Sequence, residues 1–292
     1  MTILKNQGHK LTSICDMLGV SRQAYYKGLK SAEEKSVLYN HLESITNDNR
    51  KKKSRVGLRT IFYKENIGDL IGLNQFEQLM SNRGYSLKPY KSYMKTTDSR
   101  GHHYKYDNLI NGLELNAENQ LIVGDITYFK PFFELYFIFH FIDYYTLEVK
   151  GVLANTNMKG INAIKVLRQV FAYNKAKKYN HNMILHTDGG GQYRSDDFQE
   201  ILKNSQIRPS QAENCFQNGL SERVNGIIKN EYLVDYEINS LSQLNKALKK
   251  IKHDINNVWP SKRLGYKTPK QFAKEARATK KKDKVVIKIK NV

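Results

Sequence analysis

Cysteine is nearly absent from this chain, which has only Cys15 and Cys215, far apart. Such a pair provides no disulfide framework and no Cys-x-x-Cys zinc pair, so a zinc site is not expected. No apolar run approaches the roughly 18 residues that a membrane span needs. Residues 1–10 also turn polar too early for a signal peptide. These absences lead us to expect a soluble, cytoplasmic protein.

Acidic residues are scarce as well. The 28 Asp and Glu stand against 48 Lys and Arg, which gives a net charge of +20. Such a field attracts polyanions, nucleic acid first and an anionic membrane surface second. The charge is +8 on residues 1–116, −1 on residues 117–239 and +13 on residues 240–292. We therefore expect a nearly neutral core between two basic arms, although solvated basic faces would explain the last dozen residues alone.

The N-terminal region has the sequence pattern of helical DNA-binding modules. Residues 11–29 predict two short helices around a turn at Gly19, with Ser21 as the N-cap of the second helix. This pattern favours a helix-turn-helix at residues 1–30, although any helical hairpin shares it. Residues 31–87 predict a second helical DNA-binding module, and residues 88–116 a linker. The side chains expected to contact DNA are Arg22, Gln23, Tyr25, Tyr26 and Lys27.

The middle of the chain predicts a mixed α/β core over residues 117–239. Three apolar, β-branched runs predict an antiparallel meander, and helices and short strands then alternate. The predicted strands are 119–129, 135–145, 147–154, 182–187 and 207–210, and the predicted helices are 159–178, 195–205 and 218–232. This element order is that of the ribonuclease-H-like fold. A basic C-terminal region, residues 240–292, then predicts a helix at 241–257 and an edge strand in "VVIKIK".

Three acidic residues of this core have positions that suggest a shared site. Asp125 lies within the first strand, Asp188 ends the fourth, and Glu222 lies in the last helix. If the first and fourth strands are neighbours, the two aspartates lie side by side. Converging carboxylates repel one another unless cations neutralise them, and an oxygen-only ligand set favours magnesium or manganese. Two such ions can activate an attacking oxygen and stabilise a leaving one at a phosphodiester.

The helix that carries Glu222 has a polar stripe opposite an apolar face. The stripe, at spacings of four, three and four, consists of Asn218, Glu222, Asn225 and Lys229. An amphipathic surface helix would show the same pattern. The three glycines after Asp188 would let a DNA backbone approach closely. Among nearby titratable residues, Asp143 suits either a ligand or a turn residue, and His186 is better explained as a packed core histidine.

Several motifs of the chain resemble, in order, those of DDE transposases, and the OrfB products of the IS-three group of bacterial insertion sequences resemble it best. The three acidic motifs are "VGDITYF", "ILHTDGGGQYRSDDF" and "ENCFQNGLSERVNGIIKNEYL". Outside them, "GVSRQAYYK", "LNQFEQLMSNRGYSLKPYK" and "LGYKTPKQF" resemble two helical motifs and a C-terminal signature of such proteins. The resemblance thus covers nearly the whole chain.

The resemblance implies a retroviral-integrase-like catalytic core in which Asp125, Asp188 and Glu222 bind two Mg²⁺, with Mn²⁺ as a substitute. It implies a basic DNA-binding residue at Lys229 and supports DNA binding by Asn225 and by the C-terminal arm with Lys262 and Arg263. It also implies copy-out, paste-in transposition at terminal inverted repeats of double-stranded DNA. Self-association on DNA, an upstream OrfA product or fusion, and a bacterial, nucleoid-associated location follow from it.

Three places depart from the family pattern. Gly189 stands where an Arg is typical, Gln217 where an Asp is usual, and Trp259 and Ser261 flank a proline where Arg-Pro-His is expected. None removes a proposed metal ligand. Two other functions remain open, a ribonuclease-H-like nuclease without strand transfer and a non-catalytic DNA-binding repressor.

Overall fold

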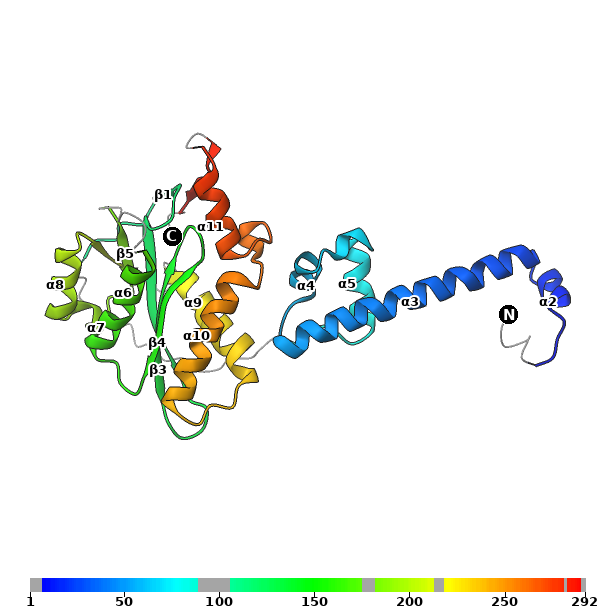
Figure 1. Ribbon diagram of the computed structural model, residues 1–292, viewed down its shortest axis with the longest axis horizontal. Helices are drawn as coiled ribbons and strands as arrows, with labels where there is room; N and C mark the ends of the chain where they lie inside the picture. The colour runs from blue at the N-terminus through cyan, green and yellow to red at the C-terminus, as the bar shows by residue number, and fades with distance from the viewer. Residues whose placement is uncertain (1–6, 89–105, 175–181, 213–217, 281–282, 290–292) are drawn as a thin grey trace. The chain divides into compact units, whose positions relative to one another are not determined.

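A computed structural model describes residues 7–88, 106–174, 182–212, 218–280 and 283–289. The chain divides into two compact units, Met1–Lys52 and Lys53–Val292 (Figure 1). The helices are α2 (Leu11–Met17), α3 (Arg22–Lys52), α4 (Leu58–Lys64), η1 (Ile67–Asp69), α5 (Leu73–Asn82), α6 (Gly160–Asn174), α7 (Gly191–Arg194), α8 (Asp196–Asn204), α9 (Gly219–Gly226), η3 (Ile227–Tyr232), η4 (Leu233–Asp235), α10 (Leu241–Asn257), η5 (Lys262–Leu264) and α11 (Pro269–Ala278). The strands are β1 (Glu114–Leu115), β2 (Leu121–Phe129), β3 (Tyr136–Asp143), β4 (Val149–Asn155), β5 (Ile184–Thr187), β6 (Arg208–Gln211) and β7 (Ile287–Lys288).

The second unit contains a five-stranded mixed sheet in the order β4-β3-β2-β5-β6. Strands β2, β3 and β4 form the predicted antiparallel meander, and β5 lies parallel to both β2 and β6. The prediction that the first and fourth strands are neighbours is therefore confirmed. Because β2 and β5 are parallel, their carboxyl ends lie at the same edge of the sheet. This topology is the mixed sheet expected of a ribonuclease-H-like core.

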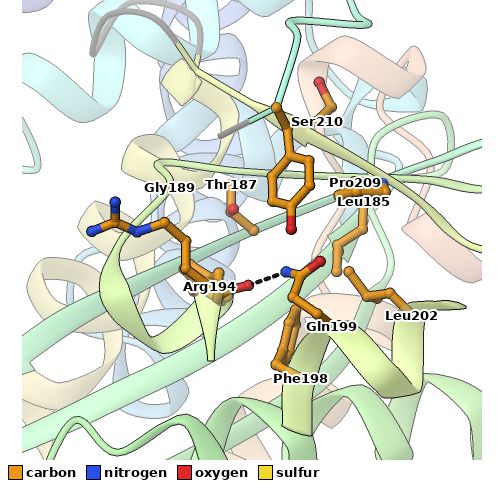
Figure 2. A pocket seen from close by; sticks show the side chains of 11 residues that line it. Leu185, Thr187, Gly189, Arg194, Phe198, Gln199, Leu202, Pro209 and Ser210 are labelled. Carbon is orange, nitrogen blue, oxygen red and sulfur yellow. Dashed lines mark hydrogen bonds between the residues drawn. The ribbon is translucent and has the colours of Figure 1, made fainter. Parts of the chain in front are cut away.

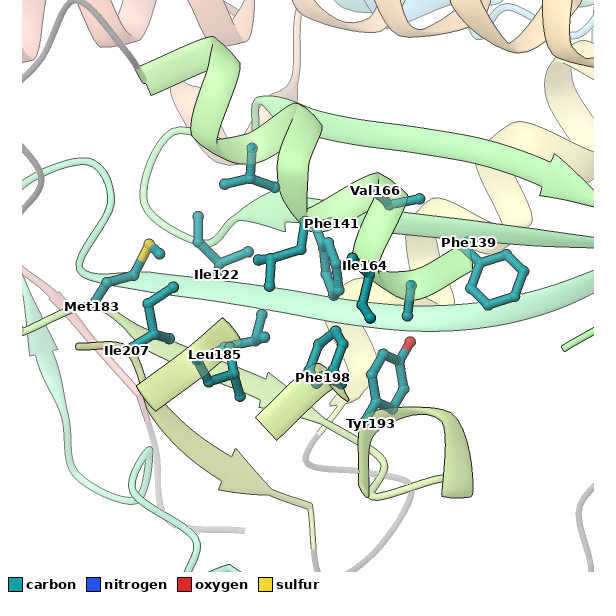
Figure 3. Close-up of a cluster of buried hydrophobic side chains, with 14 residues drawn as sticks. Ile122, Phe139, Phe141, Ile164, Val166, Met183, Leu185, Tyr193, Phe198 and Ile207 are labelled. Carbon is teal, nitrogen blue, oxygen red and sulfur yellow. The ribbon is translucent and has the colours of Figure 1, made fainter. Parts of the chain in front are cut away.

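One face of the sheet packs its apolar side chains against α6, α7 and α8 (Figure 3). Phe139 and Phe141 of β3 meet Val166, Leu167 and other residues on the apolar face of α6. The alternation of strand residues places Ile122 on this face and Asp125 on the opposite one. The opposite face is covered by α9, which contacts β2, and by α10, which contacts β4.

Helix α10 is part of this second unit rather than of a separate C-terminal arm. It begins at the N-cap Ser240, whose Oγ accepts from the Gln243 N–H at 3.2 Å, and it packs on the edge strand β4. The Asn256 amide bonds both the N–H and the C=O of Val149, at 2.9 and 3.0 Å. The Asn245 amide does the same for Ala154, at 2.9 and 3.0 Å. These bonds satisfy backbone groups that an edge strand otherwise leaves open.

The helices that follow Lys53 also pack on the C-terminal region. The Lys53 ammonium lies 2.6 Å from the Glu231 carboxylate, and the rings of Tyr63 and Tyr266 stack at 3.7 Å. Both Lys53 and Lys64 lie over the buried Trp259 ring. The regions predicted as two independent DNA-binding arms therefore share an interface. Composition does not reveal such packing, because the same cations could equally face solvent.

Other boundaries also differ from the sequence prediction. Helix α3 runs continuously through the predicted boundary at residues 30 and 31, because Gly28 is tolerated within the helix and no proline interrupts it before Lys52. Helix α11, which was not predicted, begins at a Thr268 capping box with Pro269 in its first turn. The predicted edge strand is β7, which pairs with β1. Most of the predicted linker, residues 89–105, lies outside the described residues. No helix among the described residues is long and apolar enough to cross a membrane.

Candidate active site

Asp125 lies where β2 extends beyond its pairing with β5. Its Oδ1 accepts from the Ile126 N–H at 2.9 Å, and its Oδ2 accepts from the Asn225 Nδ2 of α9 at 2.7 Å. The last paired residues of β2 and β5 are Val123 and His186. Two residues further along each strand are Asp125 and Asp188, so the topology brings the two aspartates to the same level at one sheet edge.

Asp188 is held by the turn that follows β5. Its Oδ1 accepts from the Gly190 N–H at 3.0 Å, an Asx-type bond that a short polar side chain makes two residues ahead. Gly189 between them has φ +74°, a left-handed conformation that favours glycine. The carboxylate is therefore fixed by its own backbone, and the sequence Asp-Gly-Gly carries the signal for this turn.

Glu222 is brought to the same edge by α9. Asn218, at the N-cap, donates from Nδ2 to the Gly124 C=O at 3.3 Å, and Asn225 bonds Asp125. These two bonds fix α9 along β2, while Val224 packs into the interior. Glu222 lies between them in sequence, in the first turn, with an exposed side chain.

The three acids influence one another electrostatically. Burial raises the pKa of Asp125 to about 7, and the negative charges of Asp188 and, to a smaller extent, Glu222 add to the shift. The bonds from Ile126 and Asn225 oppose it. Within the described ranges, however, no three His, Cys, Asp or Glu side chains already converge as a metal-binding group. The fold thus brings the three acids into one field without completing a ligand shell.

Lys229 lies beyond Asp125 along the same helix, where α9 continues as the π-helical segment η3. Its ammonium stands 4.8 Å from the centre of the Tyr128 ring of β2. Burial lowers the pKa of Lys229, while Asp125 opposes that shift. A π-helical turn is rare and occurs often at functional sites. The predicted polar stripe is therefore packed along β2, and only part of it faces solvent.

The two alternative residues do not join the site. Asp143 is fully buried and accepts from the backbone N–H groups of Asn119, Tyr145 and Thr146, so it is the turn residue. His186 is buried, with Nδ1 at 2.9 Å from Ser210 Oγ, and burial lowers its pKa to about 4. It is thus a core histidine, as the sequence suggested.

The glycine at 189 explains a departure from the family pattern. A Cβ built at this position would lie 2.2 Å from Cδ of Gln211, so even alanine needs Gln211 to move. An Arg at this place is incompatible with the present loop. Within the protein, Gly189 makes its close approach to Gln211 of β6, whereas Gly191 has open space around it. Gln217 lies outside the described residues.

A cavity lies under this loop, between β5, β6 and α8 (Figure 2). Its lining includes Thr187, Arg194, Gln199 and Ser210, and the Gln199 amide donates to the Tyr193 C=O. Its volume is about 10 Å³, room for a single water. The cavity is therefore too small to accept a substrate.

One predicted DNA contact in the first unit is wrong. Tyr25 is buried between α2 and α3, because its ring completes the small core that contains Ile14 and Cys15. Arg22, Gln23, Tyr26 and Lys27 are exposed at the start of α3. The helical pattern predicted which residues belong to this helix, but it could not decide which of two neighbouring tyrosines faces inward.

The predicted C-terminal contacts differ from each other. Lys262 and Arg263 are both exposed, but the Arg263 guanidinium stacks 4.3 Å from the Tyr144 ring centre and donates to the Tyr144 C=O at 3.2 Å. Trp259 is buried beneath lysine cations, and the Ser261 N–H donates to the Lys267 C=O at 3.0 Å. Arg263 therefore ties the C-terminal region to the connection between β3 and β4, whereas the Ser261 bond lies within the C-terminal region.

Sequence reasoning missed three supports of the acids, namely the Ile126 N–H, the Gly190 N–H and the Tyr128 ring beside Lys229. The Asp-x-Gly pattern could have revealed the second. The other two depend on how β2 extends past β5 and on where α9 lies, which no local pattern encodes.

Comparisons with known proteins agree with this geometry. The integrase core domain family matches residues 116–214, and a second family of the same description matches residues 203–269. The transposase for insertion sequence element IS904 of Lactococcus lactis is 23% identical over 84% of this chain and 96% of that protein. An uncharacterized 31 kDa protein of insertion element IS600 of Shigella sonnei is 25% identical over 89% of this chain and 97% of that protein.

Two further matches cover a smaller part of this chain. Transposase InsF for insertion sequence IS3A of Escherichia coli is 31% identical over 37% of each chain. The HTLV-2 integrase catalytic core domain in complex with magnesium is 25% identical over 54% of this chain and 97% of that chain, with a TM-score of 0.44. Because integrase core matches span the sheet and the relatives align along nearly their whole length, this chain belongs to the DDE transposases of the IS-three group.

Proposed function

We propose that Asp125, Asp188 and Glu222 are the catalytic carboxylates of this transposase and that they hold two Mg²⁺, with Mn²⁺ able to substitute. One observation carries the proposal. Parallel pairing of β2 and β5 sets the two aspartates level at one edge, and the Asn225–Asp125 bond fixes the helix of Glu222 beside them. Three acids that are distant in sequence thereby share one open edge.

The residues fit divalent ions in chemistry and in charge. The donors are carboxylate oxygens, which Mg²⁺ prefers. Burial and, after it, repulsion from Asp188 raise the pKa of Asp125, and a bound cation would relieve that repulsion. Glu222 is exposed at the start of α9, so it has room to turn toward the aspartates when ions and DNA bind. We therefore expect the ligand shell to be completed on DNA.

Bound at this site, the ions would activate the attacking oxygen and stabilise the leaving oxygen of a phosphodiester. The protein's own groups hold this arrangement: Ile126 and Asn225 fix the two oxygens of Asp125, and Gly190 fixes Asp188. The Lys229 ammonium lies beside Tyr128, close enough to Asp125 to interact with its charge, and would bind a DNA phosphate.

The reaction would proceed in two in-line displacements. Water first opens a phosphodiester at the element end, which frees a 3′-hydroxyl. That hydroxyl then attacks a second phosphodiester, so one P–O bond forms as another breaks. No covalent protein intermediate is needed.

The proposed substrate is double-stranded DNA with terminal inverted repeats, transposed by a copy-out, paste-in route. The exposed Arg22, Gln23, Tyr26, Lys27 and Lys262 would contact it, because they are polar or basic groups in solvent on a chain of net charge +20. We also propose that the protein associates with itself on DNA and acts with an upstream OrfA product or as a fusion to it. Its expected location is the bacterial nucleoid.

The test is a strand-transfer assay with labelled end DNA and Mg²⁺. We expect Asp188→Asn and Glu222→Gln each to abolish cleavage and joining while end binding stays within about twofold. Asp197→Asn, an exposed aspartate at the start of α8, is the matched control and should remain active. Cleavage without joined products would favour a nuclease, and DNA-dependent activity that persists in Asp188→Asn would favour a repressor.

A further inference from the structure

The β2–β3 hairpin carries apolar side chains that the fold leaves in solvent. Phe133 is 96% exposed, Phe132 62% and Leu135 42%, all within the connection between Phe129 and Tyr136. A turn of this kind normally carries polar residues, and adjacent exposed aromatics commonly mark a binding surface. We call residues 130–135 the hairpin tip.

The hairpin tip lies beyond the carboxyl end of β2, the strand that carries Asp125. Strand β2 runs from the level of Asp125 toward Phe129, and β5 runs parallel to it and ends just before Asp188. At about 3.3 Å per residue, the tip begins about 16 Å beyond Asp125, and because residues 131–133 bend, its phenylalanines lie no more than about 25 Å away. A DNA strand rises about 3.4 Å per nucleotide, so this span corresponds to about five to eight nucleotides.

Positive charge lines the path between the acids and the tip. The Lys229 ammonium lies over Tyr128 of β2, and Lys130 is exposed where the tip begins. The nearby acidic residue of the tip, Glu134, accepts a hydrogen bond from the Tyr136 hydroxyl. A phosphate backbone that leaves the acids along β2 would thus meet cations first and then an aromatic surface.

We propose that Phe132 and Phe133 contact unstacked bases of the DNA strand held at the acidic site, about five to eight nucleotides from the reacting phosphate. This inference rests on the proposed catalytic function. Aromatic rings bind bases of any sequence because every base has a π-face on which a ring can stack. The tip would keep the end open while the strand is positioned.

A second copy of the chain is the less suitable occupant. A stable protein interface buries about 800 Å² on each partner, far more than three side chains at a turn can provide. DNA needs only one or two exposed rings, which is what the tip offers.

The experiment uses the full chain and a duplex with the terminal inverted repeat of the element that carries this gene. 2-Aminopurine is placed, in separate duplexes, at positions two to twelve nucleotides from the reacting phosphate. Wild type should raise its fluorescence at about positions five to eight, since the probe brightens when unstacked. Phe132→Ala/Phe133→Ala should abolish this signal and reduce joining of paired ends about tenfold. Mismatches at these positions should restore joining.

Three further variants distinguish loss of the aromatic rings from loss of any exposed apolar pair and from loss of catalysis. Val285→Ala/Val286→Ala truncates an adjacent exposed apolar pair elsewhere, 57% and 56% exposed, and should behave as wild type. Phe132→Leu/Phe133→Leu keeps apolar bulk but loses the rings, so it should stay defective. Asp188→Asn should keep the fluorescence signal without chemistry, which separates this inference from the catalytic proposal.

An unchanged fluorescence profile in the Phe132→Ala/Phe133→Ala protein would overturn the inference. So would a lower mass of that variant in light scattering without DNA, because the tip would then be covered by a second copy. If wild type shows the signal but never joins DNA, the catalytic proposal fails while the tip contact stands.

Discussion

Two groups of buried or half-buried charge in the second unit differ in how they are neutralised. Beneath β4, the Lys150 ammonium is fully buried 2.7 Å from the Glu148 carboxylate, with Glu118 3.9 Å away. Two more side chains belong to this balanced group. The Lys252 ammonium donates to the Lys150 C=O, and the Tyr173 hydroxyl donates to the Glu148 carboxylate. At the other group, Asp125 and Asp188 interact through their charges, an amide and backbone N–H groups donate to them, and the partly buried Lys229 lies close enough to interact with Asp125.

The presence or absence of a permanent partner decides whether a buried charge stabilises the fold. A buried charge with a permanent partner stabilises one arrangement of the chain, and removal of the partner is strongly unfavourable. Carboxylates left in mutual repulsion destabilise the folded state until a cation binds, a property typical of functional sites.

The largest expected effect comes from the balanced group. Lys150→Met should lower the free energy of unfolding by about 3–5 kcal/mol, because Glu148 would remain buried without the ammonium that lies 2.7 Å from it. Urea unfolding followed by circular dichroism measures it. Glu148→Gln/Lys150→Met should recover most of the loss. A loss below about 1 kcal/mol in the single variant would contradict the contrast.

His140 adds a pH dependence on the face of β3 that faces α9 and α10. Burial lowers its pKa to about 4, and the unfolded chain takes up this proton near pH 6.5. Between these values the unfolded state binds more protons, so stability should fall as pH falls, by about 3 kcal/mol at most. Unfolding curves of wild type and His140→Leu between pH 4 and 7.5 should diverge in that window. Parallel curves would show that the imidazole does not carry the effect.

The hydrogen bonds from α10 to the edge strand β4 should contribute less to the free energy of unfolding. Asn256→Ala leaves the N–H and C=O of Val149 without their amide partner, and we expect a loss of about 1–3 kcal/mol. The neighbour Asn257, whose amide donates to the His253 C=O on the exposed side, is the matched control, and Asn257→Ala should lose under about 0.5 kcal/mol. Thermal unfolding compares the two, and equal losses would mean that α10 does not seal the edge.

The smallest effect has the opposite sign. Asp125→Asn should raise the stability of the metal-free protein by about 1 kcal/mol, because it removes a carboxylate that burial and Asp188 disfavour, while it abolishes chemistry. The comparison is calorimetry in EDTA at pH 7.5 against Asp197→Asn, which should be neutral or slightly destabilising. A destabilised Asp125→Asn protein would mean that the acids do not strain the fold.

Much of the second unit was predictable because local patterns and tertiary packing agree there. Alternating and apolar runs placed β2, β3 and β4 to within about two residues, and the pattern of α10 gave its bounds at Leu241 and Asn257. Short elements without a strong period, α7 and α11, were missed. No local signal marks that α3 continues from the first predicted module at residues 1–30 into the second at residues 31–87.

The sequence by itself determined the element order, the excess positive charge and which three acids could meet, because periodicity, composition and motif spacing are properties of the chain. Only the tertiary structure decided that Tyr25 faces inward, that Asn225 bonds Asp125 and that Gly189 must make room for Gln211. These facts depend on contacts between segments far apart in sequence, whose distances are set by packing rather than by local pattern.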